Sequence, residues 1–139
     1  EESFAALTER LLGLPDVAPV YIAGPDEEAP VGEIVARLSR PAPVIGPMSL
    51  GALAGALREA DLLIVNATGT AHLAAAVGTP TFCFLSRYTK TVWMPREGPH
   101  HGVVSASWES CRDIDVDAAW AALAPLLAAL PRRLAKSER

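Results

Sequence analysis

The chain has 139 residues, of which 50% are hydrophobic and 20% charged, and its formal net charge is −4. This composition supports one globular domain with a hydrophobic core, and it disfavours nucleic acid as a partner because the basic residues are few and scattered. No apolar run approaches the roughly 18 residues that a membrane-spanning helix requires. The opening Glu-Glu-Ser-Phe has neither an initiator Met nor the layout of a signal peptide, and we expect residues 1–139 to be a single-domain piece of a longer protein.

The two cysteines give no argument for a disulfide or a zinc site. Cys83 falls in a predicted buried strand and Cys111 in a late loop, and neither has metal-ligand spacing with a histidine. A reducing cytoplasm is therefore the expected location.

The first part of the chain alternates helical and strand-like patterns, punctuated by glycine and proline. The predicted elements are a helix over 3–12, a strand over 17–23, a helix marked by Ile34, Val35 and Leu38, a strand over 44–45, and a helix capped by Ser49 with Leu50, Leu53, Ala54 and Leu57 on its apolar face.

The second part continues the alternation, beginning with an unbroken apolar run typical of strands in parallel sheets. The predicted elements are a strand over 62–65, a helix over 70–77 with Leu73, Ala76 and Val77 in one stripe and Gly78 as its stop, a strand over 81–85, a polar loop over 86–101, a strand over 102–105, and a helix over 116–130 capped by Asp115, with Ala119, Trp120, Leu123 and Leu127 facing inward and Pro125 kinking or splitting it.

This alternation predicts the fold class. Helices that follow strands one by one are typical of a Rossmann-like, doubly wound α/β fold with a mainly parallel sheet and helices on both faces. Ligands of such folds bind at the carboxyl ends of the strands.

The segment 66–69 forms the turn at the end of one such strand. Backbone N–H groups in the first turn of the following helix favour an anion there. Gly69 lets a phosphate approach the main chain, Thr68 and Thr70 add hydroxyl donors, and His72 falls in the same turn. The spacing also admits a simpler interpretation, in which Thr68 only caps the helix, Gly69 relieves the turn, and His72 is a satisfied or exposed histidine.

The binding free energy of a nucleotide requires contacts beyond the helix start. A helix terminus contributes only about 0.3–1 kcal/mol to anion binding, whereas micromolar affinity corresponds to about 8 kcal/mol.

The run PMSLGALAGALREADLLIVNATGTAHLAAAVGTP, residues 47–80, resembles the C-terminal donor-binding domain of the lipopolysaccharide heptosyltransferases, glycosyltransferase family 9. The shared pattern comprises a Ser-Leu helix start, Ala-Asp before an apolar strand, Thr-Gly, and His-Leu-Ala-Ala-Ala with Gly-x-Pro. The resemblance extends more weakly upstream to 23–28 and downstream to Trp93-x-Pro95 and the Cys111 segment.

This resemblance implies a GT-B architecture of two Rossmann-like domains, with residues 1–139 as the second. The family transfers heptose from ADP-heptose to the lipopolysaccharide core, so the expected partners are a nucleotide-sugar donor and, through the missing N-terminal domain, the core acceptor. The enzyme would work in the cytoplasm, peripheral to the inner membrane. The general base would lie on the other domain, so residues 1–139 alone should bind nucleotide without turnover.

The resemblance also implies site residues. The residues expected around the donor are Thr68, Gly69, Thr70 and His72 at the diphosphate, the backbone of Met48 and Ser49 at the adenine, and Glu28 or its neighbour Glu27 at the ribose. The two glutamates are equally well interpreted as acidic residues at the start of a helix.

Catalysis would come from donors aimed at the charge that develops on the departing diphosphate, with His72 as the catalytic residue. No metal or cofactor is expected. The one Asp-x-Asp, Asp113-Ile-Asp115, precedes a predicted helix and is interpreted as helix capping rather than a metal-nucleotide site.

The chain departs from the family pattern in two places. Ala67 stands where many members carry an aspartate, which leaves the donor open to another nucleotide sugar. Residues 86–90 read Ser-Arg-Tyr-Thr-Lys in place of a glycine-containing turn, and Arg87 or Lys90 could reach a phosphate or be solvated loop charges. A non-catalytic nucleotide-binding or interaction module is the other alternative.

Overall fold

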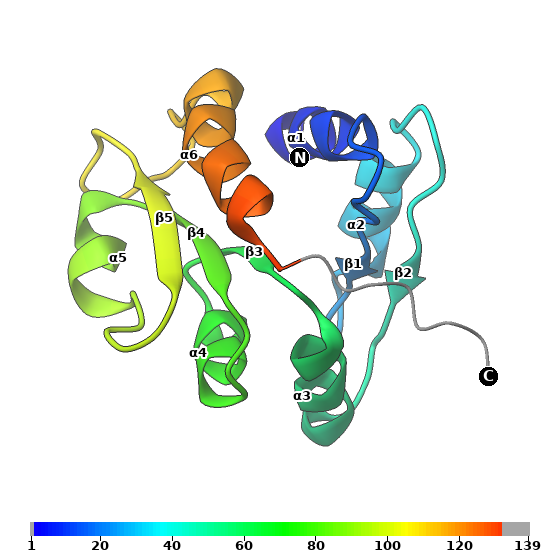
Figure 1. The fold of residues 1–139 in the computed structure, drawn as a ribbon, viewed down its shortest axis with the longest axis horizontal. Helices are drawn as coiled ribbons and strands as arrows, with labels where there is room; N and C mark the ends of the chain where they lie inside the picture. Colours follow the sequence, from blue (N-terminus) through cyan, green and yellow to red (C-terminus); the bar gives the residue numbers. More distant parts are fainter. Residues whose placement is uncertain (1, 132–139) are drawn as a thin grey trace. The chain divides into compact units, whose positions relative to one another are not determined.

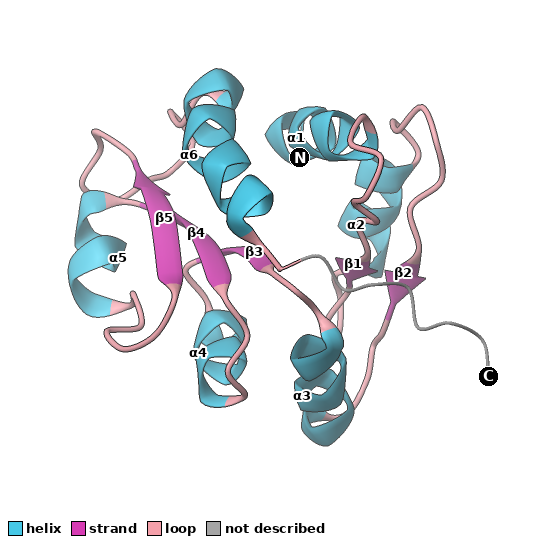
Figure 2. Cartoon of the chain, viewed as in Figure 1, coloured by secondary structure: helices cyan, strands magenta, loops and turns pink. Residues whose placement is uncertain are grey.

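The computed structural model describes residues 2–131 and alternates helices with parallel strands (Figure 1; Figure 2). Its contacts divide the chain into two compact units, Glu1–Ala60 and Asp61–Arg139. Each unit is α/β, and every strand pair is parallel, as the sequence predicts. The strands form two separate sheets rather than one. The assignment of residues 1–139 to a single domain of a longer protein stays a prediction.

The first unit carries short strands between its helices. Its elements are α1 (Glu2–Leu12), β1 (Tyr21–Ile22), α2 (Glu28–Val35), β2 (Val44–Ile45) and α3 (Leu50–Glu59). Tyr21 lies opposite Val44 and Ile22 opposite Ile45. The Tyr21 hydroxyl reaches the Thr8 hydroxyl at 2.6 Å, so β1 is tied to α1.

Three expectations for this unit need correction. The strand predicted over 17–23 is only two residues long, because Pro19 has no N–H to donate to a ladder. The second helix ends at Val35, so Leu38 lies outside it. Leu50, expected on the apolar face of α3, is 71% exposed.

The second unit is built on a three-stranded parallel sheet in the order β3-β4-β5. Its elements are β3 (Leu63–Asn66), α4 (Gly69–Ala76), β4 (Thr81–Leu85), α5 (Arg87–Val92), β5 (His100–Val104) and α6 (Val116–Ala129). Helix α4 packs on β3 and β4, and α6 packs on β5. The central strand is the most buried, since Phe82, Cys83 and Leu85 are at most 1% exposed.

The predicted polar loop over 86–101 contains a helix. Ser86 and Thr89 form a capping box: the Thr89 amide donates to Ser86 Oγ at 3.1 Å, and the Ser86 amide donates to Thr89 Oγ1 at 2.8 Å. No residue of α5 is buried, so the segment has no apolar periodicity from which a helix could be predicted. The last strand also begins earlier than predicted, at His100, whose Nδ1 lies 2.8 Å from Thr81 Oγ1.

Two helices also differ from expectation. The buried residues of α4 are Ala71 and Ala74, and Ala76 is exposed, so the predicted stripe is wrong. Helix α6 runs through Pro125 as one element, so the predicted splitting is wrong, while the cap at Asp115 is confirmed. Gly78 ends α4 with a φ of +82°, as predicted.

Within residues 2–131, no helix combines the length and apolarity needed to cross a bilayer.

Candidate functional site

The turn from β3 into α4 is open to solvent. Asn66, Thr68 and Gly69 are exposed, and Thr70 is half-buried. Thr68 occupies the N-cap position with an extended backbone, but its hydroxyl makes no capping hydrogen bond to α4. The interpretation of Thr68 as merely a side-chain cap is therefore wrong, and the hydroxyl is available to another group at the helix start.

Gly69 leaves open space at the start of α4. Apart from its chain neighbours and the backbone of its own helix, a Cβ at this position would meet no protein atom within 4 Å. The protein fold itself does not require glycine here, whereas close approach of a ligand to the main chain would. Helix α4 has eight residues and begins at this open end. The Ala71 amide donates to the Thr68 carbonyl at 3.1 Å, so Gly69 and Thr70 carry the first-turn amides that a ligand could use.

His72 projects outward from the same helix turn. Its side chain is exposed, and its ring lies beside Trp93, with 5.8 Å between the ring centroids and 54° between the planes. Trp93 follows the last residue of α5. The indole thus restricts the imidazole on one side while leaving it accessible to a ligand.

A cavity of about 190 Å³ opens at the carboxyl ends of β3 and β4. Asn66 and Phe84 are opposite each other in the sheet, so both strands contribute to it. The residues that line the cavity are Asn66, Ala67, Phe84, Ser86, Thr89, Glu109 and Cys111. Its lining includes Ala67 and one acidic residue, Glu109.

Ala67 also belongs to the edge of the hydrophobic core. It packs against a buried cluster of three residues together with two further half-buried ones; the cluster is Ala71, Cys83 and Leu85, and the others are Val65 and Met94. A methyl group at position 67 therefore fills apolar space on one side and faces the cavity on the other.

The predicted adenine and ribose residues lie in the first unit. Ser49 caps α3, since its Oγ accepts from the Ala52 amide at 3.2 Å. Glu27 is the N-cap residue of α2, and its Oε2 accepts from the Gly24 amide at 2.8 Å. Glu28 is exposed at the first position of α2, and Met48 is half-buried. Their roles toward a nucleotide stay predictions.

The structure brings the predicted diphosphate residues together within the second unit, at the first turn of α4 and its preceding turn. The predicted ribose residues lie at the start of α2 and the predicted adenine residues at the start of α3, both in the first unit. Sequence reasoning missed Ser86, Thr89 and Glu109, which share the cavity with Ala67. The Ser-x-x-Thr spacing directly after a strand is the signal for the first two.

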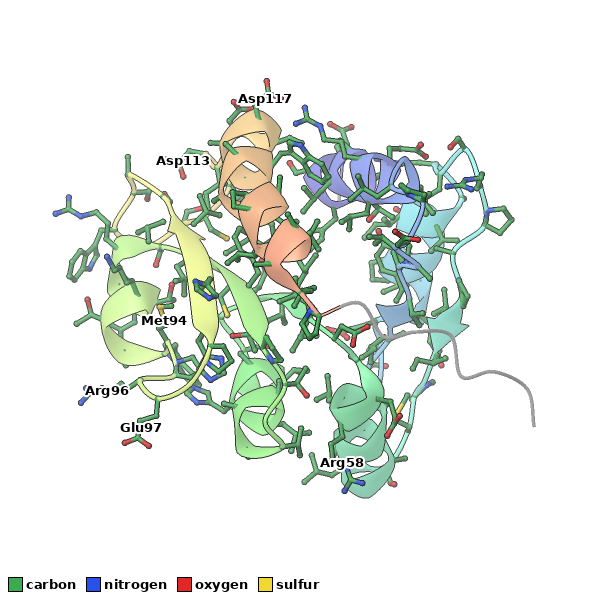
Figure 3. All side chains as sticks on the ribbon, in the orientation of Figure 1. Arg58, Met94, Arg96, Glu97, Asp113 and Asp117 are labelled. Atoms are coloured by element: carbon green, nitrogen blue, oxygen red, sulfur yellow. The ribbon has the colours of Figure 1, made fainter. Side chains whose placement is uncertain are left out.

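The Asp-x-Asp segment separates into two roles. Asp115 caps α6 through its Oδ1, which accepts from the Asp117 amide at 3.3 Å. Asp113, labelled in Figure 3, instead accepts a hydrogen bond from the Ser105 hydroxyl, and this bond lowers the pKa of the Asp113 carboxyl. Capping is confirmed for Asp115 and wrong for Asp113, which braces the loop after β5.

Arg87 and Lys90 lie on α5 rather than in a loop. They line a second cavity of about 460 Å³, together with Thr91, Val104 and Trp108. No residue is common to this lining and that of the cavity at Ala67.

Comparisons with known proteins agree with this fold. The model of the family described as glycosyltransferase family 9 (heptosyltransferase) matches residues 1–112. A crystal structure of a family 9 glycosyl transferase from Veillonella parvula DSM 2008 is similar in fold, with a TM-score of 0.78 at 22% identity over 91% of this chain and 41% of that chain. This chain thus spans about two fifths of the length of that protein.

No curated protein matches the chain. The family match nevertheless covers most of the sequence, from the first residue to the segment that contains Cys111. The chain belongs to glycosyltransferase family 9.

Proposed function

We propose that this chain is the donor-binding part of a glycosyltransferase that transfers heptose from ADP-heptose to the lipopolysaccharide core. The donor diphosphate binds at the start of α4, through the Thr68 hydroxyl and the amides of Gly69 and Thr70. The observation that carries this proposal is the exposed, unobstructed Gly69 at the carboxyl end of a parallel strand. Such helix starts favour phosphate through their amides and dipole.

Transfer of the sugar separates charge. Positive charge develops on the sugar as its bond to the diphosphate breaks, and negative charge accumulates on the departing diphosphate. The amides at Gly69 and Thr70, the Thr68 hydroxyl and the His72 ring stabilise that negative charge. The proposal requires neither metal nor cofactor, and it assigns the base that deprotonates the acceptor hydroxyl to a second domain. Residues 1–139 alone would then bind nucleotide without turnover.

The full enzyme would act in the cytoplasm, beside the inner membrane that holds its acceptor. The unpaired thiols of Cys83 and Cys111 support a reducing compartment.

A donor with a different sugar or base is the second candidate, favoured by the cavity at Ala67. A methyl group replaces the carboxylate that many family members present there, and Glu109 presents its carboxylate from another segment. Changed polar contacts at such a point alter which hydroxyl pattern a site accepts.

Calorimetric titration of the full-length protein with ADP, UDP, GDP and ADP-heptose tests the proposal. ADP should bind more tightly than UDP or GDP, and the Gly69→Ala variant should bind ADP at least about tenfold more weakly, because the added methyl blocks the approach of the phosphate. The matched control is Gly55→Ala in α3, where an added Cβ also meets nothing within 4 Å.

Tighter binding of UDP or GDP than of ADP would show that the donor carries a different nucleotide, and the proposed site at α4 would stand. If no nucleotide binds, or if Gly69→Ala binds ADP like the unmodified protein, the donor site at α4 is refuted. Nucleotide binding without transfer to any acceptor by the full-length protein would favour the non-catalytic module.

A further inference from the structure

We propose that the cavity on α5 is a second binding site, for a phosphorylated saccharide, separate from the donor site. It is lined by Arg87, Lys90, Thr91, Val104 and Trp108 and has a volume of about 460 Å³. We call it the α5 groove. It combines two cations, one hydroxyl and an exposed indole, and none of these residues belongs to the donor site proposed above.

The two cations share one face of the helix. Arg87, Lys90 and Thr91 are spaced i, i+3 and i+4, which places their side chains side by side on a helix surface. Arg87 and Lys90 are exposed, and among residues 2–131 neither has a carboxylate partner. Neighbouring like charges repel, so an anion between them is favoured.

Phosphate suits this pair of side chains. The guanidinium offers a planar fork of N–H donors that matches two phosphate oxygens, and the ammonium adds a compact charge with three donors. The Thr91 hydroxyl donates to the Arg87 carbonyl at 3.1 Å, so its oxygen remains able to accept from a ligand hydroxyl.

Trp108 forms a wall of the groove that is already in place. The Tyr88 amide donates to the Trp108 carbonyl at 3.0 Å, and the Arg87 amide donates to the Ser107 carbonyl at 3.0 Å. The Tyr88 and Trp108 rings pack with their centroids 6.0 Å apart. The loop that carries Trp108 is also fixed by Ser105, whose Oγ accepts from the Ser107 amide at 2.8 Å. A ligand therefore meets a preorganised surface.

The apolar surface beside the cations points to a ligand with an apolar face. Trp108 is 57% exposed, Val104, which lines the groove beside it, 37%, and Tyr88, whose ring packs on Trp108, 45%. Exposed apolar side chains gathered at one place mark binding surfaces more often than scattered ones do. A pyranose carries C–H groups on one face that can pack on an indole, while a phosphate on the same sugar reaches the cations.

A nucleotide fits the groove less well. Recognition of a base requires donors and acceptors matched to its edge, and the lining offers only the Thr91 hydroxyl beyond the two cations. A membrane surface would also meet cations and aromatic rings here, but two basic residues are fewer than the clusters that bind anionic lipid. The volume of about 460 Å³ suits a small ligand.

The test is calorimetric titration of the full-length protein at low salt with glucose 6-phosphate, inorganic phosphate and glucose as probes. Glucose 6-phosphate should bind about fivefold or more tightly than inorganic phosphate, and glucose should not bind measurably. The Arg87→Gln/Lys90→Gln variant should lose at least about tenfold in affinity for glucose 6-phosphate. Trp108→Leu should bind glucose 6-phosphate only as well as inorganic phosphate.

The matched control is Arg96→Gln, an exposed arginine that lies after α5 and outside the groove lining (Figure 3). It should bind glucose 6-phosphate like the unmodified protein. Circular dichroism and the melting temperature verify that each variant is folded, which is expected because all the substituted side chains are exposed.

Four results would overturn the assignment. The first two are equal binding of inorganic phosphate and glucose 6-phosphate, and tighter binding of AMP than of glucose 6-phosphate. The third is displacement of glucose 6-phosphate by saturating ADP in direct competition. The fourth is that glucose 6-phosphate does not bind, while the protein is retained on phosphatidylglycerol vesicles in a way that depends on Arg87 and Lys90. The ADP competition separates this groove from the donor site, whose own failure would appear in the Gly69→Ala titration.

Discussion

At the scale of single residues, His72 is the side chain whose chemistry most directly tests the proposed reaction. It is exposed at the first turn of α4, and its ring is positioned by Trp93. His72→Ala in the full-length enzyme should lower kcat by about 10²–10³, because one donor to a developing oxyanion has that value. The affinity for ADP should change by less than about tenfold, since the ground-state diphosphate keeps its amide contacts. Steady-state kinetics and calorimetry measure the two effects.

His101→Ala is the control, because His101 is an exposed histidine of β5 outside the α4 turn. Trp93→Leu separates chemistry from positioning: it removes the ring neighbour while keeping the imidazole, so its effect on kcat should be smaller. An unchanged kcat in His72→Ala would remove the assigned catalytic role.

At the scale of elements, the close approach of β4 and β5 depends on Gly102, which lies opposite Cys83 in the parallel register. A Cβ at this position would lie 2.7 Å from the Cys83 carbonyl oxygen and 2.8 Å from Leu85 Cδ1. The oxygen belongs to the central strand and cannot move without disturbing the ladder. Gly102→Ala should therefore destabilise the protein by about 1–3 kcal/mol, measured by urea unfolding.

Gly69→Ala serves as the stability control within the same unit, because nothing lies within 4 Å of the added methyl. It should unfold within about 0.5 kcal/mol of the unmodified protein. If Gly102→Ala is as stable as Gly69→Ala, the strands tolerate a side chain at this contact and the packing argument is wrong.

At the scale of the whole molecule, the reaction rates of the two thiols measure how rarely the sheet of the second unit opens to solvent. Cys83 is 1% exposed on the central strand, and burial raises the pKa of its thiol, whereas Cys111 is half-buried at a cavity. Since the thiolate is the reactive form, Cys111 should react with maleimide first. Cys83 should react on the order of 100-fold more slowly, by way of opening of the sheet.

Mass spectrometry of labelled peptides over a urea series measures both rates. Cys111→Ser leaves Cys83 as the remaining thiol of residues 1–139 and isolates the slow rate. Equal labelling of both thiols in native buffer would contradict the burial of β4.

Local patterns in the sequence determined much of this protein. The apolar run before Asn66, the Thr-Gly turn and the Gly78 stop are short-range signals, and they predicted β3, α4 and the open helix start. The same is true of the caps at Ser49 and Asp115, because a cap needs only a side-chain oxygen beside the first amides of its own helix.

Tertiary structure alone decided which residues meet. The parallel register joins Asn66 to Phe84, and the loop after β5 adds Glu109 to their cavity, although the three are far apart in sequence. Helix α5 has no buried residue and thus no apolar period, so the α5 groove arises only when its backbone bonds to the Trp108 loop. Such contacts form between residues that are far apart in the sequence, and no pattern among neighbouring residues predicts them.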